Sequence, residues 1–271
     1  LLPKWERTLT PELEEQMLSL YSMGNSYEDI QWHMRRMYGI EYSTGLITQV
    51  TERVWQEVET WRNRPLQSLY AFVYLDGIIY KVREDGKVVT KAIYSVLGVD
   101  MEGNREILGL YIGGAEGAKH WGRVLENLRD RGVEDVLFFC VDGLKGFSQA
   151  IAEVYPQSIV QRCIVHMIRT SLKHVSYGDY KAICKDLRTV YAAPDRLSAE
   201  AALIAFGEKW DKKYPEIRQK WEESWLELSA YFDYSEPVRR VMYTTNAVEA
   251  LHRQMRKVTK TKGAFVSEKA L

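Results

Sequence analysis

Two carboxylates stand inside apolar runs of the sequence, where neither is needed for solubility. Asp76 interrupts the run at 72–79, and Asp142 ends the run at 137–142. A carboxylate in a buried strand is costly to desolvate unless something pairs with it. Mg²⁺ takes hard oxygen ligands, and two such ions about 3.5–4 Å apart can cleave and join phosphodiesters. Asp76 and Asp142 are therefore candidate metal ligands, provided that their strands are neighbours in one sheet.

Each aspartate alone has a simpler explanation. Asp76 could pair with a buried lysine or arginine, and Asp142 could cap a helix that begins after Gly143. For either residue by itself we favour that simpler explanation. For the two together, on adjacent strands, we favour a metal site.

A third ligand would have to come from a helix packed on that sheet, and Glu249 is in a position to supply it. The sequence predicts a helix with Thr245 or Asn246 as its cap and Glu249 in its first turn. A glutamate near a helix N-terminus is by itself an ordinary partner of the helix dipole. What distinguishes Glu249 is the basic segment that follows it.

Positive charge is local in this chain. Lys+Arg and Asp+Glu number 37 each, so the formal net charge is zero, whereas a nucleic-acid-binding protein needs a basic footprint against the phosphates. Residues 251–263 contain no acidic side chain. The lysines and arginines that follow His252 there form what we call the basic stripe: Arg253, Arg256, Lys257, Lys260 and Lys262. We predict that the basic stripe, with His252 directly before it, holds DNA phosphates; a solvated basic face is the alternative.

Residues 1–65 predict an α-helical unit. Thr10-Pro11, the capping box Ser26-x-x-Asp29 and Ser43 are start signals for three helices with amphipathic spacing. Three short helices with tight turns are typical of a helix-turn-helix unit. Its third helix would offer these side chains to DNA: Ser43, Thr44, Thr48, Gln49 and Arg53. An ordinary helical lead-in or a dimerisation hairpin explains the pattern equally well.

The middle of the chain predicts an α/β domain. Three β-rich runs joined by short turns indicate an antiparallel meander, after which helices and strands alternate. The predicted elements are strands at 72–80, 88–99 and 107–112, a helix at 118–130, a strand at 136–141, a helix at 146–154 and a strand at 158–160. This β-β-β-α-β-α-β order is that of the ribonuclease-H-like fold, an assignment by analogy that does not fix function.

Residues 164–240 predict an all-helical domain rich in large aromatic side chains. It interrupts the α/β pattern between Asp142 and Glu249, as an insertion would. Its aromatic residues could serve DNA binding, dimerisation or only the domain's own core.

Four motifs carry a resemblance to a known family. In order along the chain they are Tyr74-Leu75-Asp76-Gly77, Val141-Asp142-Gly143-Leu144-Lys145-Gly146-Phe147, Gln161-Arg162-Cys163-Ile164-Val165-His166 and Thr244-Thr245-Asn246-Ala247-Val248-Glu249. Together they resemble the signature of bacterial insertion-sequence transposases related to the eukaryotic Mutator elements. The resemblance covers roughly residues 10–271.

The resemblance implies a DDE transposase. It assigns Asp76, Asp142 and Glu249 to a catalytic triad that holds two Mg²⁺ ions, for which Mn²⁺ could substitute. The implied activity is metal-dependent cleavage of double-stranded DNA at the terminal inverted repeats of a mobile element, followed by strand transfer into target DNA.

Other motif residues receive supporting roles from the same resemblance. Cys163, His166 and Asn246 would shape the active site, and His166 could contact DNA or orient a triad carboxylate. Lys145 would be a further DNA contact. The resemblance also implies a homodimer, because two element ends must be held together, and a bacterial cytoplasmic protein associated with the nucleoid.

The implied organisation has three parts. Residues 1–65 would form the helix-turn-helix-like unit, residues 66–163 and 241–271 the ribonuclease-H-like catalytic core, and residues 164–240 the all-helical insertion domain.

Three alternatives remain open. Cys163 and His166 could be two of the four ligands of a zinc ion, but His174 and Cys184 complete no familiar zinc module by their spacing. The enzyme could be a plain ribonuclease-H-like nuclease, although simple hydrolysis requires neither the helical insertion nor a helix-turn-helix unit. It could also be a domesticated DNA-binding protein without catalysis, which the presence of all three acidic residues disfavours.

The bulk composition fits a globular protein. Hydrophobic residues make up 46% and charged residues 27%, so neither a disordered nor a fibrous chain is indicated. No apolar run reaches the roughly 18 residues of a membrane span, and the first residues do not form a secretory signal. The three cysteines fit reduced thiols in a cytosolic protein. Because the chain begins with leucine, we expect it to be part of a longer protein.

Overall fold

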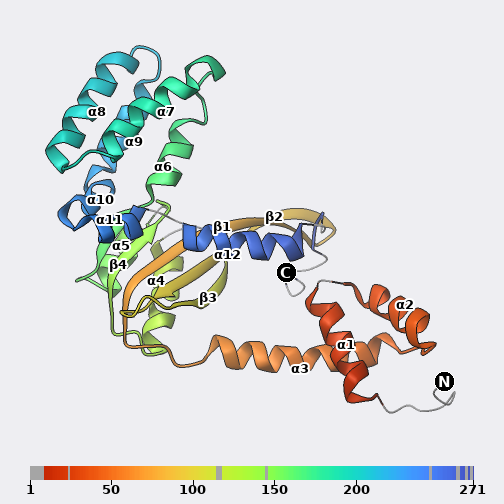
Figure 1. The fold of residues 1–271 in the computed structure, drawn as a ribbon. Helices are drawn as coiled ribbons and strands as arrows, with labels where there is room; N and C mark the ends of the chain where they lie inside the picture. The colour runs from red at the N-terminus through yellow and green to blue at the C-terminus, as the bar shows by residue number, and fades with distance from the viewer. Residues whose placement is uncertain are drawn as a thin grey trace. The chain divides into compact units, whose positions relative to one another are not determined.

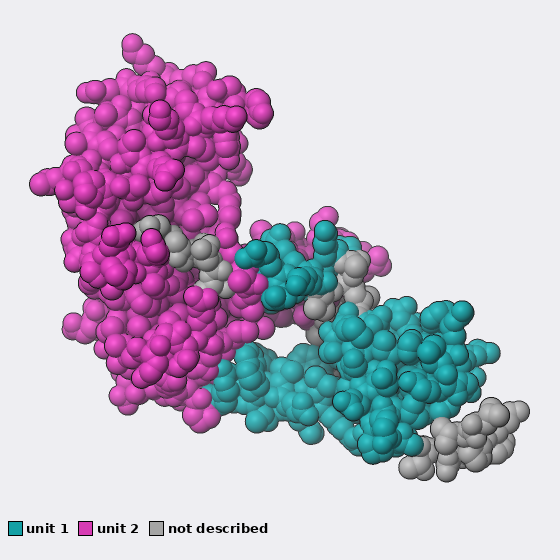
Figure 2. Space-filling view, in the orientation of Figure 1, with its two compact units in different colours: residues 1–64, 253–263 teal, residues 65–252, 264–271 magenta. Residues whose placement is uncertain are grey.

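A computed structural model of the chain describes most of its residues. These are residues 9–23, 25–113, 118–143, 146–243, 246–260, 263–265, 268 and 271, without the side chains of residues 243, 246, 247 and 258. The chain divides into two compact units (Figure 2), residues 1–64 with 253–263 and residues 65–252 with 264–271.

The N-terminal part of the first unit contains the three predicted helices: α1 (Pro11–Ser22), α2 (Tyr27–Tyr38) and α3 (Thr44–Arg62). Their start signals act as predicted. The Ser26 hydroxyl accepts from the Asp29 amide and the Asp29 carboxylate accepts from the Ser26 amide, which completes the capping box. Ser43 caps α3 by accepting from the Leu46 amide.

A small apolar core joins these helices. Met17 of α1, Ile30 and Met34 of α2 and Ile47 of α3 are fully buried in it. The apolar face of α2 is shorter than its sequence pattern suggests, because Met37, one turn after Met34, is exposed.

The second unit is built on a five-stranded mixed sheet with the strand order β3-β2-β1-β4-β5 (Figure 1). Its strands are β1 (Leu69–Glu84), β2 (Lys87–Val99), β3 (Arg105–Gly113), β4 (Asp135–Val141) and β5 (Ile159–Arg162). β1, β2 and β3 form the predicted antiparallel meander. The β1–β2 turn is Asp85-Gly86, and both residues have positive φ, as a tight hairpin turn requires.

Two helical crossovers extend the sheet in parallel. α4 (Ala118–Asp130) leads from β3 to β4, and α5 (Phe147–Val154) leads from β4 to β5. β4 pairs in parallel with β1 on one side and with β5 on the other. The order β-β-β-α-β-α-β predicted from the sequence is therefore confirmed, and the unit is mixed α/β.

Side chains of β4 alternate between apolar cores on the two faces of the sheet. Phe139 and Val141 pack with α4 and α5, where Trp121 is fully buried. Phe138 belongs to the core of the helical region, and Cys140 packs against Val248. Successive residues of a strand face opposite sides of the sheet, so α4 and α5 cover one face while the later helices and Val248 cover the other.

The helical region follows β5 without a further strand among its described residues, and α6 leads into it (Figure 1). Its helices are α6 (Ile164–Ser171), α7 (Tyr177–Tyr191), α8 (Arg196–Trp210), α9 (Pro215–Glu223), α10 (Trp225–Leu228), the 3-10 helix η1 (Ala230–Asp233) and α11 (Glu236–Tyr243). Most of the predicted aromatic residues fill its core. Trp221 is fully buried and donates from Nε1 to the Ser171 hydroxyl at 2.9 Å.

The last helix, α12 (Asn246–Thr259), begins against the sheet. Val248 in its first turn is fully buried with Tyr74 of β1 and Leu97 of β2. None of the described helices has the length and apolar composition that a bilayer crossing needs.

A polar cluster fastens the start of α7 to the α8–α9 turn. Asp179 accepts from Lys213, from the Tyr214 hydroxyl at 2.7 Å and from the Ser176 hydroxyl at 2.8 Å. The ion-paired hydrogen bond from Lys213 comes first among the causes that lower the pKa of Asp179 to about 2.

This cluster predicts a pH dependence of stability. A carboxyl whose pKa is lower in the folded state stabilises that state above its unfolded pKa of about 4, and the contribution is lost as the pH falls toward the folded pKa. We therefore expect the difference in free energy of unfolding between wild type and Asp179→Asn to be full at pH 7 and to shrink between pH 4 and 2. Urea unfolding followed by tryptophan fluorescence measures it. A difference that stays constant over this range would contradict the assignment, and Lys213→Gln should reproduce part of the effect.

Candidate active site

Asp76 and Asp142 occupy matching positions on paired strands. β1 and β4 run in parallel with Leu75 opposite Val141, so Asp76 and Asp142 are the next residue of each chain segment. Asp76 lies two residues after Tyr74, and Asp142 lies two residues after Cys140. Because side chains of a strand alternate between faces, both aspartates lie on the face of the sheet that Val248 covers. The prediction that the two strands are neighbours in one sheet is confirmed.

A histidine completes a compact group with the two aspartates. Asp76, Asp142 and His166 each offer one ligand atom, and these atoms lie within 4.8 Å of one another. Asp76 is the most buried of the three, with 7% of the residue exposed. This is the only group of three or more such side chains within the described part of the chain, and it contains neither Cys163 nor the predicted zinc candidates His174 and Cys184.

Cys163 positions His166 through the start of α6. The Cys163 amide donates to the carbonyl of Val141 at 2.7 Å, which fixes the end of β5 beside the end of β4. Cys163 is the N-cap of α6, and its buried Sγ accepts from the His166 amide at 3.5 Å. The Cys-x-x-His spacing therefore places the histidine in the first turn of a helix that begins at the sheet edge.

A second histidine reaches Asp76 from α12. His252 is buried, and its Nδ1 lies 3.6 Å from Asp76 Oδ2, while His166 Nε2 lies 3.8 Å from Oδ1. Oδ1 also accepts from the Gly77 amide at 2.7 Å. Among the described residues, the candidate ion-pair partners of Asp76 are these two histidines, and no lysine or arginine takes that place.

The other simple explanation, Asp142 as a helix cap, also fails. α5 begins at Phe147 and its N-cap is Gly146.

The electrostatics around His166 favour a neutral imidazole. Burial is the main cause that lowers the pKa of His166, and the carboxylate of Asp76 acts in the opposite direction. Arg169 lowers this pKa further and Glu249 raises it.

Glu249 lies outside the compact group and pairs with Arg169. Its Oε1 accepts from Arg169 Nη2 at 3.1 Å, and Arg169 Nη1 lies 3.4 Å from His166 Nε2. Arg169 thus links the carboxylate of α12 to the histidine of the group.

Comparison with known proteins identifies the family. The model described as "Transposase, Mutator family" matches residues 1–271. The chain belongs to the Mutator family of transposases.

Relatives cover the whole chain. The transposase for insertion sequence element ISRM3 of Rhizobium meliloti (strain 1021) is 44% identical over 271 residues, which are 100% of this chain and 68% of that protein. A probable insertion-sequence transposase of Corynebacterium diphtheriae is 40% identical over 100% of this chain and 79% of its own length. The transposase for IS905 of Lactococcus lactis subsp. lactis (strain IL1403) is 31% identical over 100% of this chain and 68% of its length.

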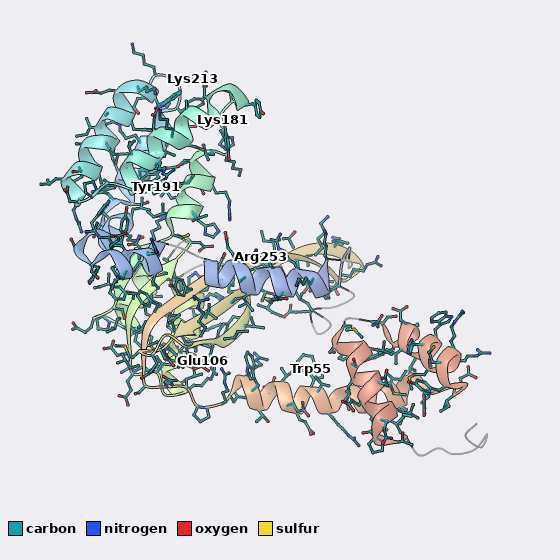
Figure 3. All side chains as sticks on the ribbon, viewed as in Figure 1. Trp55, Glu106, Lys181, Tyr191, Lys213 and Arg253 are labelled. Carbon is teal, nitrogen blue, oxygen red and sulfur yellow. The ribbon has the colours of Figure 1, made fainter. Side chains whose placement is uncertain are left out.

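The basic stripe of this Mutator-family chain lies in part on α12. Arg253, Arg256 and Lys257 are exposed on the helix, and Figure 3 labels Arg253 there; Lys260 follows it and is also exposed. The prediction that His252 belongs to this basic face is wrong, because His252 is buried with its Nδ1 beside Asp76.

Three of the five DNA-contact candidates at α3 have intramolecular partners. Ser43 caps the helix, the Thr48 hydroxyl donates to the Thr44 carbonyl at 2.9 Å, and Arg53 pairs with Glu14 of α1. Gln49 is exposed. Several other predicted residues lie outside the described residues: Lys145, Lys262, Thr244 and Thr245, together with the side chain of Asn246.

Two site residues escaped the sequence prediction. Arg169 follows His166 by three positions and His252 follows Glu249 by three, and residues with this spacing share one helix face. This spacing from the predicted site residues could have identified both as neighbours of the site.

Gly143, directly after Asp142, allows the Arg162 side chain to approach the backbone closely. Its φ is +81°, and a Cβ there would lie 2.4 Å from Arg162 Nε. The Arg162 guanidinium donates to the Ser224 hydroxyl at 2.6 Å.

We expect Gly143→Ala to lower the free energy of unfolding by more than Gly103→Ala. Gly103 has a similar φ of +89° but open space where its Cβ would stand. Gly103→Ala therefore measures only the backbone strain, which costs about 1–2 kcal/mol. The excess at Gly143 measures the displacement of Arg162. Urea unfolding of both variants gives the comparison, and equal losses would show that Arg162 moves aside without cost.

Proposed function

We propose that this chain is a DDE transposase that cleaves DNA at the ends of an insertion sequence element and transfers the strand to target DNA. The observation that carries the proposal is the pair of carboxylates Asp76 and Asp142 at matching positions of two parallel strands, grouped with His166. Family membership over residues 1–271 supports the reaction class.

The proposal includes a ribonuclease-H-like core. The strand order β3-β2-β1-β4-β5, with an antiparallel meander and two parallel strands, supports this assignment. We propose residues 66–163 and 241–271 as the core, residues 164–240 as an inserted helical domain and residues 1–65 as a DNA-binding unit. The separate core of the helical region supports its status as an insertion, although Phe138 of β4 contributes to that core.

The donor set fits Mg²⁺. Asp76 and Asp142 offer hard carboxylate oxygens, and Glu249 offers a third. Bound there, two Mg²⁺ or Mn²⁺ ions would activate the attacking oxygen and stabilise the leaving one. An imidazole nitrogen is not a preferred Mg²⁺ ligand, so we assign His166 and His252 to the orientation of the Asp76 carboxylate.

The ion pair with Arg169 does not prevent Glu249 from acting as the third ligand. The side chains of Arg169 and Glu249 are 62% and 39% exposed. An exposed ion pair contributes only about 0–1 kcal/mol. Glu249 can therefore leave Arg169 at little cost.

The proposed DNA contacts are the basic stripe and the α3 side chains. Arg253, Arg256 and Lys257 recur on α12 at spacings of three and four, which suits contact with successive phosphates. We propose action as a homodimer on double-stranded DNA, in the bacterial cytoplasm at the nucleoid.

Substitution of the triad tests the proposal. We expect Asp76→Asn, Asp142→Asn and Glu249→Gln each to lower strand cleavage and joining by about 10²-fold or more, the loss typical of removing a preorganised charge-stabilising group. Each should also weaken Mn²⁺ binding, measured by the electron paramagnetic resonance of free Mn²⁺. The substrate is a labelled element-end duplex with Mg²⁺ or Mn²⁺.

The matched control is Glu236→Gln. Glu236 lies in the first turn of α11, as Glu249 lies in the first turn of α12. Glu236 is exposed and lies outside the proposed site. Its rate should equal that of wild type. Wild-type rates from Asp142→Asn would disprove the triad, cleavage without joining would indicate a nuclease, and binding without chemistry would indicate a domesticated DNA-binding protein.

The basic stripe makes a separate prediction about salt. Replacing Arg253, Arg256 and Lys257 together by glutamine should weaken duplex binding and reduce the slope of log K against log salt by about 3, because each lost phosphate contact removes about 0.9. Fluorescence anisotropy at several salt concentrations measures the slope.

A charge-matched control separates the basic stripe from net charge. Arg123 and Arg129 on α4 and Lys87 in the β1–β2 hairpin are exposed and lie outside the stripe. Their triple glutamine variant removes the same charge and should leave the slope nearly unchanged. Equal slopes for both triple variants would contradict the proposed footprint.

A further inference from the structure

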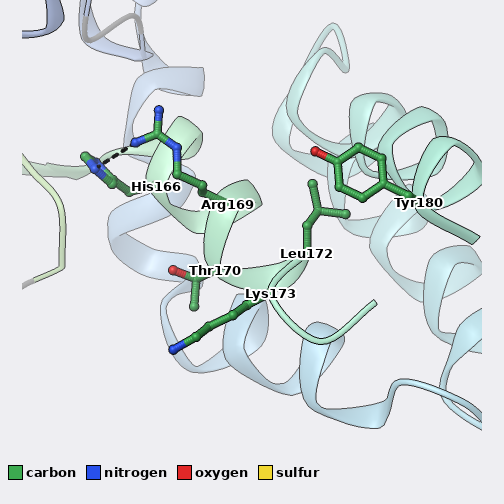
Figure 4. Close-up of a pocket in the computed structure, with 6 residues that line it drawn as sticks. All are labelled: His166, Arg169, Thr170, Leu172, Lys173 and Tyr180. Atoms are coloured by element: carbon green, nitrogen blue, oxygen red, sulfur yellow. Dashed lines mark hydrogen bonds between the residues drawn. The ribbon is translucent and has the colours of Figure 1, made fainter. Parts of the chain in front are cut away.

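A basic pocket of about 420 Å³ opens between α6 and α7 (Figure 4). Its lining residues are His166, Arg169, Thr170, Leu172, Lys173 and Tyr180. None of them is acidic. Figure 4 shows the Leu172 side chain directed toward the ring of Tyr180, whereas the side chains of Thr170 and Lys173 extend to the other side of α6.

The pocket adjoins the candidate active site through two shared residues. His166 lines the pocket and also belongs to the group with Asp76 and Asp142. Arg169 lines the pocket and also pairs with Glu249. Whatever occupies the pocket therefore lies next to the carboxylates.

Positive charge near the pocket is not cancelled by the acids of α7. Asp179 is paired with Lys213, and Asp186 with Lys209, both from beyond α7. Lys173 is exposed and has no ion-pair partner among the described residues. Since Arg169 is paired with Glu249, Lys173 is the lining residue whose positive charge can attract an anion.

Tyr180 differs from most aromatic residues of the helical region. Phe206, Trp221 and Tyr231 are buried in its core, whereas Tyr180 is 46% exposed and lines the pocket. An exposed aromatic ring beside cations is the combination that binds single strands, since a base stacks on the ring while lysine or arginine contacts the phosphates.

We propose that this pocket binds an unpaired stretch of the DNA strand next to the scissile phosphate, with a base stacked on Tyr180 and a phosphate held by Lys173. The proposal rests on the proposed function, because it concerns DNA held at the same site. A paired duplex could use Lys173 but offers no free base to the ring. An acidic peptide could likewise use the charge without the ring.

The test compares two DNA probes of the same sequence in EDTA, so that no chemistry occurs. One is a fully paired duplex and the other is a fork with a short unpaired tail. Tyr180→Ala should weaken binding of the fork by about tenfold or more, the loss expected for one stacked base, and should change duplex binding little. Tyr180→Phe keeps the ring and should bind both probes as wild type does.

Two further variants sharpen the test. Tyr177 lies one turn before Tyr180 on α7, is 95% exposed and does not line the pocket, so Tyr177→Ala should bind the fork as wild type does. Lys173→Gln should reduce the salt slope on the fork by about 0.7. Equal losses for Tyr177→Ala and Tyr180→Ala, or an equal loss on fork and duplex, would overturn the proposal.

Failure of this proposal can be told apart from failure of the proposed function. The fork-to-duplex ratio needs no catalysis, so it stays informative even if triad variants keep wild-type cleavage rates. Conversely, Asp142→Asn could lose cleavage as expected while Tyr180→Ala leaves the ratio of fork to duplex binding unchanged. That result would overturn the pocket proposal alone. Thermal unfolding of each variant confirms that the fold is intact.

Discussion

The parallel pairing of β1 with β4 is the constraint on which the candidate site depends. Its register sets Leu75 opposite Val141, so the residue that follows each is an aspartate. Because side chains alternate across a sheet, a slip of one residue would send one carboxylate to the opposite face, where α4 and α5 pack. The apolar side chains that flank Asp76 and Asp142 therefore do more than fill the cores. They fix the register that brings two carboxylates together.

The buried Asp76 carboxylate accepts from the Gly77 amide and is flanked by two histidines from distant segments. His166 arrives on α6 because Cys163 caps that helix and donates its amide to Val141. His252 arrives on α12 because Val248, one turn earlier, is anchored in the core of the sheet. Two imidazoles that flank one carboxylate leave it accessible to a cation, whereas a lysine or arginine would neutralise it permanently. The local folding of both helices thus places two imidazoles beside the same carboxylate.

The order of elements was predictable from sequence because periodicity and turn chemistry are local. Asp85-Gly86 and the capping box at Ser26 determine their turn and helix start within a few residues. The pairing of Asp76 with Asp142 needed only the further assumption that β1 and β4 are neighbours. The contact of Arg169 with Glu249 joins residues far apart in sequence through packing, which periodicity does not report. Burial was equally hidden: nothing in the sequence separates Tyr180 from the aromatic residues that became core.

Arg169 connects these observations. With Glu249 bound to it, the guanidinium is occupied and the third carboxylate is held apart from the other two. If Glu249 moves to a metal ion, as the proposed function requires, Arg169 loses its counter-charge while it lines the same pocket as Lys173. A phosphate is the natural replacement, since guanidinium pairs with phosphate as well as with carboxylate. Assembly of the metal site and capture of the DNA strand would then favour each other, because each releases a partner that the other requires.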